Sequence, residues 1–230
     1  MKKLGLVGGI GPASTLDYYK GIIDVFRMKT AEGNYPQIII DSINLAEMYD
    51  LAAKKQWDLF TCRLVDSIKN LAAGGAEFAA MAANTAHIVF DEVKGKAPLP
   101  LISIVDETCK YALSKNCKSV VIFGTAFTMS SGLYTNAFTK YGIDAFIPTE
   151  NEQKAIHDII FPNLQEGIVL PEDKKTIMQI ADRMIAEQKA DALILGCTEL
   201  PLIIKNDDLD ALLLDTTQIH IEAIVDYMLS

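Results

Sequence analysis

The chain carries one local pattern twice: an acidic residue, a short apolar run and a polar turn. Residues 76–85 (AEFAAMAANT) align with residues 190–199 (ADALILGCTE), which lie 114 residues further along the chain. Residues 6–8 (LVG) likewise align with residues 122–124 (IFG), at an offset of 116. Because self-similarity at a nearly constant offset indicates a repeated structural unit, the sequence predicts two related half-chains.

The alternation of apolar and amphipathic segments along the chain predicts the fold class. Short apolar runs alternate with longer amphipathic stretches, which is typical of β-strands and helices around parallel sheets. Strands are expected at KLGLVG, QIIIDSI, FAAMAA, LISIV, SVVIFG, DAFIPT, ALILG and, at an edge, ALLLDT. Helices are expected at 15–28, 56–73, 106–115, 131–141, 150–165 and 172–188. We therefore expect two similar α/β domains, residues 1–100 with 212–230 packing back, and residues 101–211.

Composition excludes several classes of function. The net charge of −9 opposes nonspecific attraction to nucleic acid or to an anionic membrane surface. No segment approaches the roughly 20 apolar residues of a membrane span, so we expect a cytoplasmic protein without nucleic-acid or membrane partners. The 4 cysteines form no CxxC pair and no metal-ligand spacing with the 3 histidines. Neither a metal site nor a disulfide is expected.

Four turns follow predicted strands and could bind an anion, because each offers small residues, backbone N–H groups and hydroxyls near a helix start. They are GGIGPAST (8–15), AANTAH (82–87), GTAFTMS (124–130) and GCTELP (196–201). Ligands of open α/β sheets bind beyond the carboxyl ends of the strands, so two facing domains would bring these turns to one cleft. Glu199 is the one charge there that would repel an anion.

The first of these turns also resembles a degraded dinucleotide fingerprint. Its glycines are followed by Asp41, which lies 30 residues after Gly11, whereas the fingerprint expects an acidic residue after roughly 20. The simpler interpretation is a tight turn from strand to helix, with Pro12 at the first helical position.

Two residues of the turns could carry proton chemistry. Cys197 lies between a buried run and a predicted helix, whose positive end is expected to lower the pKa of its thiol. Cys62, Cys109 and Cys117 are expected to be small buried apolar residues without polar neighbours. His87 lies four residues after Ala83; it could donate to a carboxylate or cap the turn, and a structural role is equally open.

Taken together, the motifs resemble the aspartate/glutamate racemase family over nearly the whole chain. The resemblance rests on GLVGGIGPAST, ANTAH, GTAFTM, PTENEQ, GCTELP and DTTQIH. It implies two pseudo-twofold related α/β domains, an active site between them, no cofactor, and a homodimer. It also implies two catalytic cysteines, one acting on each face of the substrate Cα, because inversion needs a base on one face and an acid on the other.

The resemblance assigns roles to particular residues. Cys197 corresponds to the second catalytic cysteine, and Ala83 occupies the position of the first. Asn84, Thr85 and Thr198 correspond to residues that hold the substrate α-carboxylate. The other candidate substrate-binding residues are Gly9, Thr125, Thr128 and Glu199, with Pro12, His87 and Lys54 as further candidates.

Ala83 departs from the family pattern and leaves three interpretations open. Alanine has no titratable proton, so the symmetrical two-thiol mechanism cannot operate. The alanine could replace an original cysteine by engineering, or the chain could be a natural member in which water or another group serves that face. It could also be a relative with one-base chemistry or none, such as a one-cysteine decarboxylase or a noncatalytic protein that binds an amino acid or a dicarboxylate.

A second departure concerns the substrate side chain. Relatives that act on aspartate hold its side-chain carboxylate with basic residues, and the positions that align here are Met48 and Gln165. Lys54 and Lys55 lie nearby on a predicted flap or on a solvated helix face. The resemblance therefore predicts an acidic amino-acid substrate without identifying it.

Overall fold

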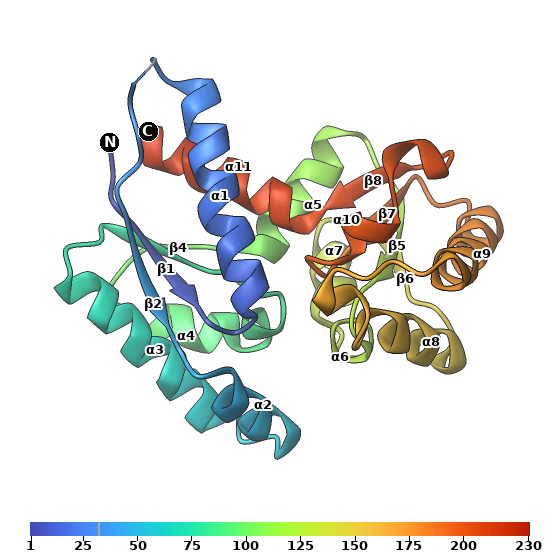
Figure 1. Ribbon diagram of the computed structural model, residues 1–230, viewed down its shortest axis with the longest axis horizontal. Coiled ribbons are helices and arrows are strands. Elements are labelled where there is room, and N and C mark those ends of the chain that lie inside the picture. Colours follow the sequence, from blue (N-terminus) through green and yellow to red (C-terminus); the bar gives the residue numbers. More distant parts are fainter. Residues whose placement is uncertain (32) are drawn as a thin grey trace. The chain divides into compact units, whose positions relative to one another are not determined.

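The computed structural model describes residues 1–31 and 33–230, which divide into two compact units (Figure 1). Unit 1 comprises Met1–Ser103 and His220–Ser230, and unit 2 comprises Ile104–Ile219. We expected residues 212–230 to pack back on the first half, and the units differ from that boundary. Residues 212–219 lie in unit 2, because the strand at Leu212–Asp215 pairs with the strand at Ala192–Leu195.

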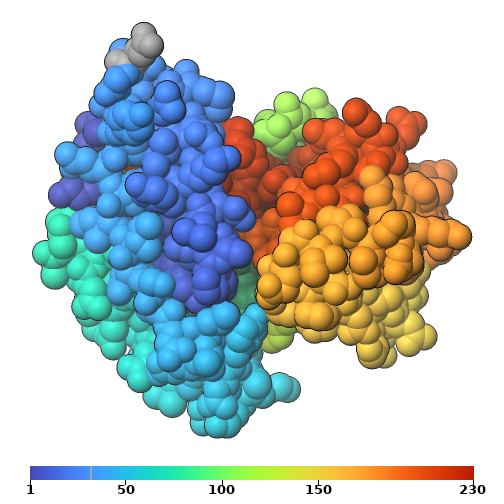
Figure 2. Space-filling model, viewed as in Figure 1, coloured from blue at the N-terminus to red at the C-terminus, as the bar shows by residue number. Residues whose placement is uncertain are grey.

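Unit 1 is built on a four-stranded parallel sheet with the strand order β2-β1-β3-β4. Its strands are β1 (Leu4–Gly8), β2 (Ile38–Ser42), β3 (Phe78–Met81) and β4 (Leu101–Ile102). Its helices are α1 (Pro12–Lys29), α2 (Leu45–Ala53), α3 (Trp57–Ala73), the short η1 (Thr85–Val89) and α4 (Phe90–Lys96). In Figure 2, α1 and the segment that leads to α2 form the blue and light-blue surface of this unit.

Unit 2 repeats the arrangement, with the parallel strand order β6-β5-β7-β8. Its strands are β5 (Ser119–Phe123), β6 (Asp144–Phe146), β7 (Ala192–Leu195) and β8 (Leu212–Asp215). Its helical segments are α5 (Ile104–Ser114), α6 (Ala126–Ser130), α7 (Leu133–Lys140), α8 (Glu150–Ile160), η2 (Leu164–Glu166), α9 (Pro171–Gln188), α10 (Leu200–Ile203) and η3 (Asn206–Asp208). The chain ends with α11 (Thr216–Leu229).

Strand register shows that the sequence repeat is a structural repeat. Leu4 of β1 pairs with Phe78 of β3, and Val120 of β5 pairs with Ala192 of β7. These pairs are related by the two offsets found in the sequence, 116 for the first strand and 114 for the second. The two α/β domains predicted from the sequence are therefore present.

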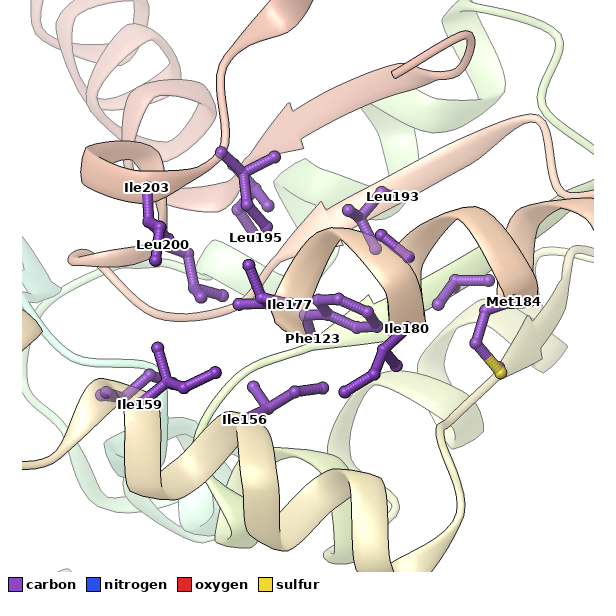
Figure 3. Close-up of a cluster of buried hydrophobic side chains, with 14 of the residues drawn as sticks. Phe123, Ile156, Ile159, Ile177, Ile180, Met184, Leu193, Leu195, Leu200 and Ile203 are labelled. Carbon is purple, nitrogen blue, oxygen red and sulfur yellow. The ribbon is translucent and has the colours of Figure 1, made fainter. Parts of the chain in front are cut away.

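Apolar side chains from the sheet and its helices form the core of each unit. In unit 2, Phe123 of β5 and Leu193 of β7 pack against Ile156 of α8 and Ile177 of α9, and all four side chains are buried (Figure 3). On unit 1, Met48, Phe60 and Leu64 belong to the equivalent cluster beneath α2 and α3. Burial of this kind stabilises by roughly 1.5–3 kcal/mol for each large side chain.

The helix after each sheet packs in the other unit. Helix α5 follows β4 of unit 1 but contributes Val105 and Cys109 to a core cluster of unit 2. Helix α11 follows β8 of unit 2, and Ile224 and Met228 belong to a core cluster of unit 1. The two halves of the repeat have therefore exchanged equivalent helices.

In each half, a buried tyrosine hydroxyl forms a hydrogen bond with a residue on the exchanged helix. The hydroxyl of Tyr18, on α1, is 2.8 Å from Nδ1 of His220 on α11. Tyr134, which lies 116 residues after Tyr18, makes side-chain hydrogen bonds with Thr108 on α5 and with Thr216. Both tyrosines are fully buried, so each hydroxyl requires such a partner.

Several expected elements are shorter than predicted, for local reasons. The strand predicted over LISIV ends at Ile102, because α5 begins at Ile104. The strand predicted over DAFIPT ends at Phe146, and Thr149 caps α8 through a capping box with Glu152. Helix α2 was not predicted, although Asn44 caps it by accepting hydrogen bonds from the backbone N–H groups of Ala46 and Glu47.

Candidate functional site

The conformation of the turn after β1 depends on a glycine and on hydrogen bonds of two hydroxyl side chains. Gly9 has a φ of +83°, and a Cβ there would lie 2.1 Å from the Ile43 carbonyl oxygen, so only glycine fits. Its N–H donates to Thr15 Oγ1 at 2.9 Å. Helix α1 begins at Pro12, the first-position proline predicted from the sequence. Ser14 donates to the Ala82 carbonyl at 2.9 Å, which joins this turn to the one after β3.

The turn after β3 carries Ala83, Asn84, Thr85 and His87. Ala83 and Thr85 are half-buried, and Asn84 is buried. Nδ1 of His87 lies 2.9 Å from the Ala83 carbonyl oxygen. Since a carbonyl only accepts, Nδ1 carries the proton, and His87 donates to the backbone of Ala83.

His87 and His220 are both buried and held in the neutral form. Burial lowers the pKa of His87 to about 4 and that of His220 to about 3. Their rings meet edge to face, with centroids 5.9 Å apart. Nε2 of His220 donates to the Ile102 carbonyl at 3.1 Å, so its Nδ1 accepts from the Tyr18 hydroxyl. Neither ring is charged at neutral pH.

In unit 2, two glycines let the turns after β5 and β7 lie against each other. A Cβ at Gly196 would lie 2.8 Å from the Phe123 carbonyl oxygen, and one at Gly124 would lie 3.1 Å from the Gly196 carbonyl oxygen. The hydroxyls of Thr125 and Thr128 are 3.1 Å apart, and Thr125 caps α6 by accepting from the Thr128 N–H. These hydroxyls therefore stand beside the turn that carries Cys197.

Cys197 and Glu199 form a hydrogen-bonded pair of groups that can exchange a proton. The half-buried Cys197 donates its S–H to Glu199 Oε2 at 2.8 Å, and the Thr198 hydroxyl donates to the same oxygen at 2.9 Å. Burial, and then the Glu199 carboxylate, raise the pKa of Cys197 well above its usual value. The lowered thiol pKa expected from the helix start is therefore wrong: α10 spans only Leu200–Ile203, and desolvation and the neighbouring charge outweigh it.

The sequence-predicted residues fall into two sets, one in each unit. Unit 1 brings together Gly9, Pro12, Ala83, Asn84, Thr85 and His87 at the carboxyl ends of the paired strands β1 and β3. Unit 2 brings together Thr125, Thr128, Cys197, Thr198 and Glu199 at the carboxyl ends of the paired strands β5 and β7.

The residues considered for substrate specificity lie on or at the end of helical segments. Lys54, at the end of α2, forms an exposed ion pair with Asp50 at 2.8 Å. Met48 belongs to the core and is 2% exposed, so it contributes packing. Gln165 is exposed on η2. Asp41, considered as the acidic residue of a dinucleotide fingerprint, accepts a hydrogen bond from the Asn70 amide at 3.3 Å.

Sequence reasoning missed the polar groups that hold the turns in place. Ser14 and Thr15 are buried at the start of α1, and Thr216 donates to the Leu195 carbonyl at 2.9 Å. Hydroxyl residues in the first turn of a helix after a glycine-rich loop were the available signal. The bond from Cys197 to Glu199 had no such signal, because it depends on the side-chain conformation of Glu199.

All four cysteines are free thiols. Cys109 and Cys117 are buried as expected, but the expected burial of Cys62 is wrong, because this residue lies on the exposed side of α3. Over residues 1–31 and 33–230, no group of three or more His, Cys, Asp or Glu side chains is placed to hold a metal ion. None of the described helices combines the length and apolarity that a membrane crossing requires.

Comparison with known proteins assigns the chain to a family. The family model for Asp/Glu/Hydantoin racemase matches residues 7–224. The chain therefore belongs to this family, and the resemblance seen in the sequence is confirmed. It is 25% identical over 219 residues to the broad specificity amino-acid racemase RacX of Bacillus subtilis, covering 93% of this chain and 92% of the relative. A glutamate racemase of Koribacter versatilis is 34% identical over 138 residues, which are 56% of this chain and 44% of that protein.

Solved structures agree with this assignment. An aspartate racemase homologue from Pyrococcus horikoshii superposes with a TM-score of 0.90 and 33% identity, covering 100% of both chains. A candidate Asp/Glu racemase from Yersinia pestis superposes with a TM-score of 0.94 and 30% identity, also over 100% of both chains. The fold of two similar α/β domains is thus shared with racemases.

Proposed function

We propose that this chain is a cofactor-independent amino-acid racemase acting on aspartate- or glutamate-type substrates, with Cys197 as its acid/base. The observation that carries the proposal is the hydrogen bond from the Cys197 thiol to Glu199, at 2.8 Å. Family membership supports proton transfer at an amino-acid Cα as the reaction.

Glu199 gives Cys197 a route to the thiolate. A raised pKa keeps the thiol protonated at rest, so it can deliver a proton to a carbanion, but it can remove one only after losing its own. The carboxylate in contact with the sulfur would take that proton. The thiolate would then accept the Cα proton, and reversal of both transfers would return a proton to carbon.

The α-carboxylate needs donors, because a carbanion beside an unpaired carboxylate is a poor intermediate. We propose that Asn84, Thr85 and Thr198 supply them, as the family resemblance implies. The turns with Gly9, Thr125 and Thr128 would close around the same substrate. Donors fixed in place before reaction stabilise developing charge more effectively than water, which must reorient.

Proton transfer on the face of the substrate Cα that would lie toward Ala83 differs from proton transfer on the face toward Cys197. Ala83 carries no proton, and His87 is held neutral with its Nδ1 bonded to the Ala83 carbonyl. We propose that water exchanges the proton on this face. The enzyme would then be chemically asymmetric: Cys197 acts quickly on one enantiomer, and the opposite face is slow.

Ala83→Cys tests this proposal by restoring the missing thiol. We expect racemisation of aspartate or glutamate to rise by about 10²–10⁴, the usual contribution of one general acid or base. Circular dichroism of the amino acid would follow the reaction. Ala86→Cys is the matched control, since it adds a thiol to the same turn at a fully buried position. An equal rise in both variants, or no rise with Ala83→Cys, would count against the assignment.

Ala83 also favours a second candidate function, a one-cysteine decarboxylase. Loss of CO2 from a dicarboxylate would generate the carbanion without any base, and the Cys197 thiol would then deliver the single proton required. Release of CO2 from a substrate with two carboxylates on one carbon would support this candidate. A chain that binds amino acids but neither exchanges their Cα proton nor releases CO2 would be a noncatalytic binding protein.

A further inference from the structure

Two buried hydroxyls lie beside the strand end that precedes Cys197 and have no role in the proposed chemistry. Thr216 and Tyr134 are 0% and 1% exposed. The Thr216 hydroxyl donates to the Leu195 carbonyl at 2.9 Å, and Tyr134 makes a side-chain hydrogen bond with Thr216. Leu195 ends β7, and its side chain packs in the core of unit 2 (Figure 3). Gly196 alone separates Leu195 from Cys197.

The hydrogen bonds of these hydroxyls have a definite direction. A carbonyl oxygen only accepts, so the Thr216 hydrogen points to Leu195. Thr108, the other threonine partner of Tyr134, likewise donates to the Ile104 carbonyl at 2.7 Å. Both threonine oxygens are therefore left as acceptors for the Tyr134 hydroxyl, and burial raises the pKa of Tyr134 so that it stays protonated. Donation thus runs from Tyr134 through Thr216 to Leu195.

The Tyr134 ring also contacts the turn that carries Cys197. A Cβ at Gly196 would lie 3.8 Å from Tyr134 Cε2 and 2.8 Å from the Phe123 carbonyl oxygen. The Gly196 N–H donates to that same carbonyl at 2.7 Å. Gly196 is therefore bounded by the backbone of β5 and by the tyrosine ring, while the residue before it is bonded to Thr216.

Strand register gives the correspondence between the two halves beyond their third strands. Ala79 pairs with Leu101, and Leu193 pairs with Leu213. Because Ala79 and Leu193 are equivalent in the repeat, Leu101 and Leu213 are equivalent too. Residues of the last strand, and of the helix after it, therefore correspond at an offset of 112.

This correspondence shows a difference between the halves. Thr108 matches His220, and each is the partner of the buried tyrosine of its half on the exchanged helix. Thr216 matches Ile104, which has no hydroxyl and cannot bond the strand end in this way. The bond from the first residue of the helix to the strand end thus belongs to the half that carries Cys197.

We propose that Thr216 and Tyr134 are positioning residues, which fix the backbone before Cys197 so that the thiol stays within hydrogen-bond distance of Glu199. This inference rests on the proposed role of Cys197 as acid/base. Proton transfer requires its donor and acceptor to be held close, and a misplacement of about 1 Å can cost about 10²-fold in rate. Side chains that support a reactive group through its backbone supply this precision.

Thr216→Val tests the proposal, because valine has the shape of threonine without its hydroxyl. In a Cys62→Ser background, the pH dependence of Cys197 alkylation gives the thiol pKa without requiring turnover. We expect a lower pKa and faster alkylation, since a thiol that leaves Glu199 for water loses both causes of its raised pKa. Cα proton exchange should fall by about 10–100-fold. Thr216→Ser keeps the hydroxyl and should restore both properties.

Thr108→Val is the matched control. It removes a fully buried threonine hydroxyl that bonds the same tyrosine, but this hydroxyl donates within α5 and not to β7. Its thiol pKa should therefore equal that of the unaltered chain. Tyr134→Phe keeps the ring beside Gly196. It should shift the pKa in the same direction as Thr216→Val but by less, because the bond from Thr216 to Leu195 remains.

The alkylation assay separates this inference from the proposed function. A shifted thiol pKa in a chain without Cα proton exchange would support the positioning of Cys197 and count against the proposed racemase. An unshifted pKa in Thr216→Val, an equal shift in Thr108→Val, or a shift that Thr216→Ser does not reverse would overturn the inference, whatever the activity. If Thr216→Val does not fold, Tyr134→Phe takes its place, and an unshifted pKa there overturns the inference as well.

Discussion

Cys197 illustrates how one neighbouring side chain can outweigh a helix terminus. Its place before a helix suggests a reactive thiolate, but the helix is a single turn and the sulfur is buried beside Glu199. The carboxylate that raises the thiol pKa is also the group that can accept its proton. A strongly basic thiolate with an adjacent proton acceptor suits abstraction from a weak carbon acid.

Glu199→Gln should lower the pKa of Cys197, because it removes a negative charge from the sulfur's nearest polar partner. It should also slow Cα proton exchange, because the amide cannot accept the thiol proton. The rate of alkylation against pH, in a Cys62→Ser background that removes the exposed thiol, measures the pKa. Glu150→Gln on α8 is the control. An unchanged or raised thiol pKa would contradict the pairing.

Asn84 is expected to contribute directly to substrate affinity. If Asn84 donates to the α-carboxylate, Asn84→Ala should weaken binding by about 1.5–3 kcal/mol, as for a hydrogen bond to a charged group. Isothermal titration with aspartate and glutamate measures the change. Asn70→Ala, on the outer side of α3, should leave affinity unaltered. Unchanged affinity in Asn84→Ala would mean that the carboxylate binds elsewhere.

The grouping of the candidate residues at two sheet edges could be predicted from sequence, because polar turns after neighbouring parallel strands converge on one edge of a sheet. That rule places Asn84 beside the glycine turn, and Cys197 beside Thr125. It could not give the thiol pKa, which depends on burial and on a side-chain rotamer of Glu199. Nor could it show that His87 bonds to the backbone of Ala83, since either ring nitrogen could have carried the proton.

At the scale of elements, strand positions were predicted well and helix ends less well. Short apolar runs mark strands, so all eight were found, but capping residues decide where helices begin. Asn44 and Asp215 cap α2 and α11 through side-chain oxygens that accept backbone N–H groups. The register of the repeat was also readable, since Gly8 ends β1 and Gly124 directly follows β5.

The buried histidines should make stability depend on pH. Both have folded pKa values, about 4 and about 3, below the unfolded value of 6.5. The unfolded chain therefore binds protons that the folded chain does not, and stability falls as pH drops from about 6.5 towards these values. Each histidine can contribute up to about 1.4 kcal/mol per pH unit. Urea unfolding between pH 4 and 7 measures the slope.

The contribution of these histidines can be isolated by substitution. His87→Gln with His220→Gln should flatten the pH dependence, because both substitutions remove a side chain whose pKa is lowered by burial. A slope that persists undiminished in the double variant would assign the dependence to other groups.

At the scale of the whole molecule, the exchange of α5 and α11 makes each unit depend on a segment that follows the other unit's sheet. Unit 1 cannot complete its core until the last helix is made, because Ile221, Ile224 and Met228 cover the side of the sheet that α1 also covers. The repeat therefore folds as one chain and not as two independent halves.

Ending the chain after Ile219 should destabilise unit 1 selectively. Removal of His220–Ser230 uncovers Tyr18, Ile22 and Phe26, and leaves the core cluster of β5, β7, α8 and α9 intact. Hydrogen exchange should show faster exchange in β1 and β3 than in β5 and β7. A chain that lacks only Ser230 is the control. Equal loss of protection in both sheets would contradict this division.

The central claim is that the two faces of the substrate Cα are served unequally, by Cys197 on one side and by no side-chain acid at position 83. The most direct test is Cα–H exchange in D2O, followed by proton NMR separately for L- and D-aspartate and for L- and D-glutamate. We predict fast exchange of one enantiomer and slow exchange of the other, with the fast exchange lost in Cys197→Ala. Equal exchange of both enantiomers, or exchange that survives Cys197→Ala, would contradict it.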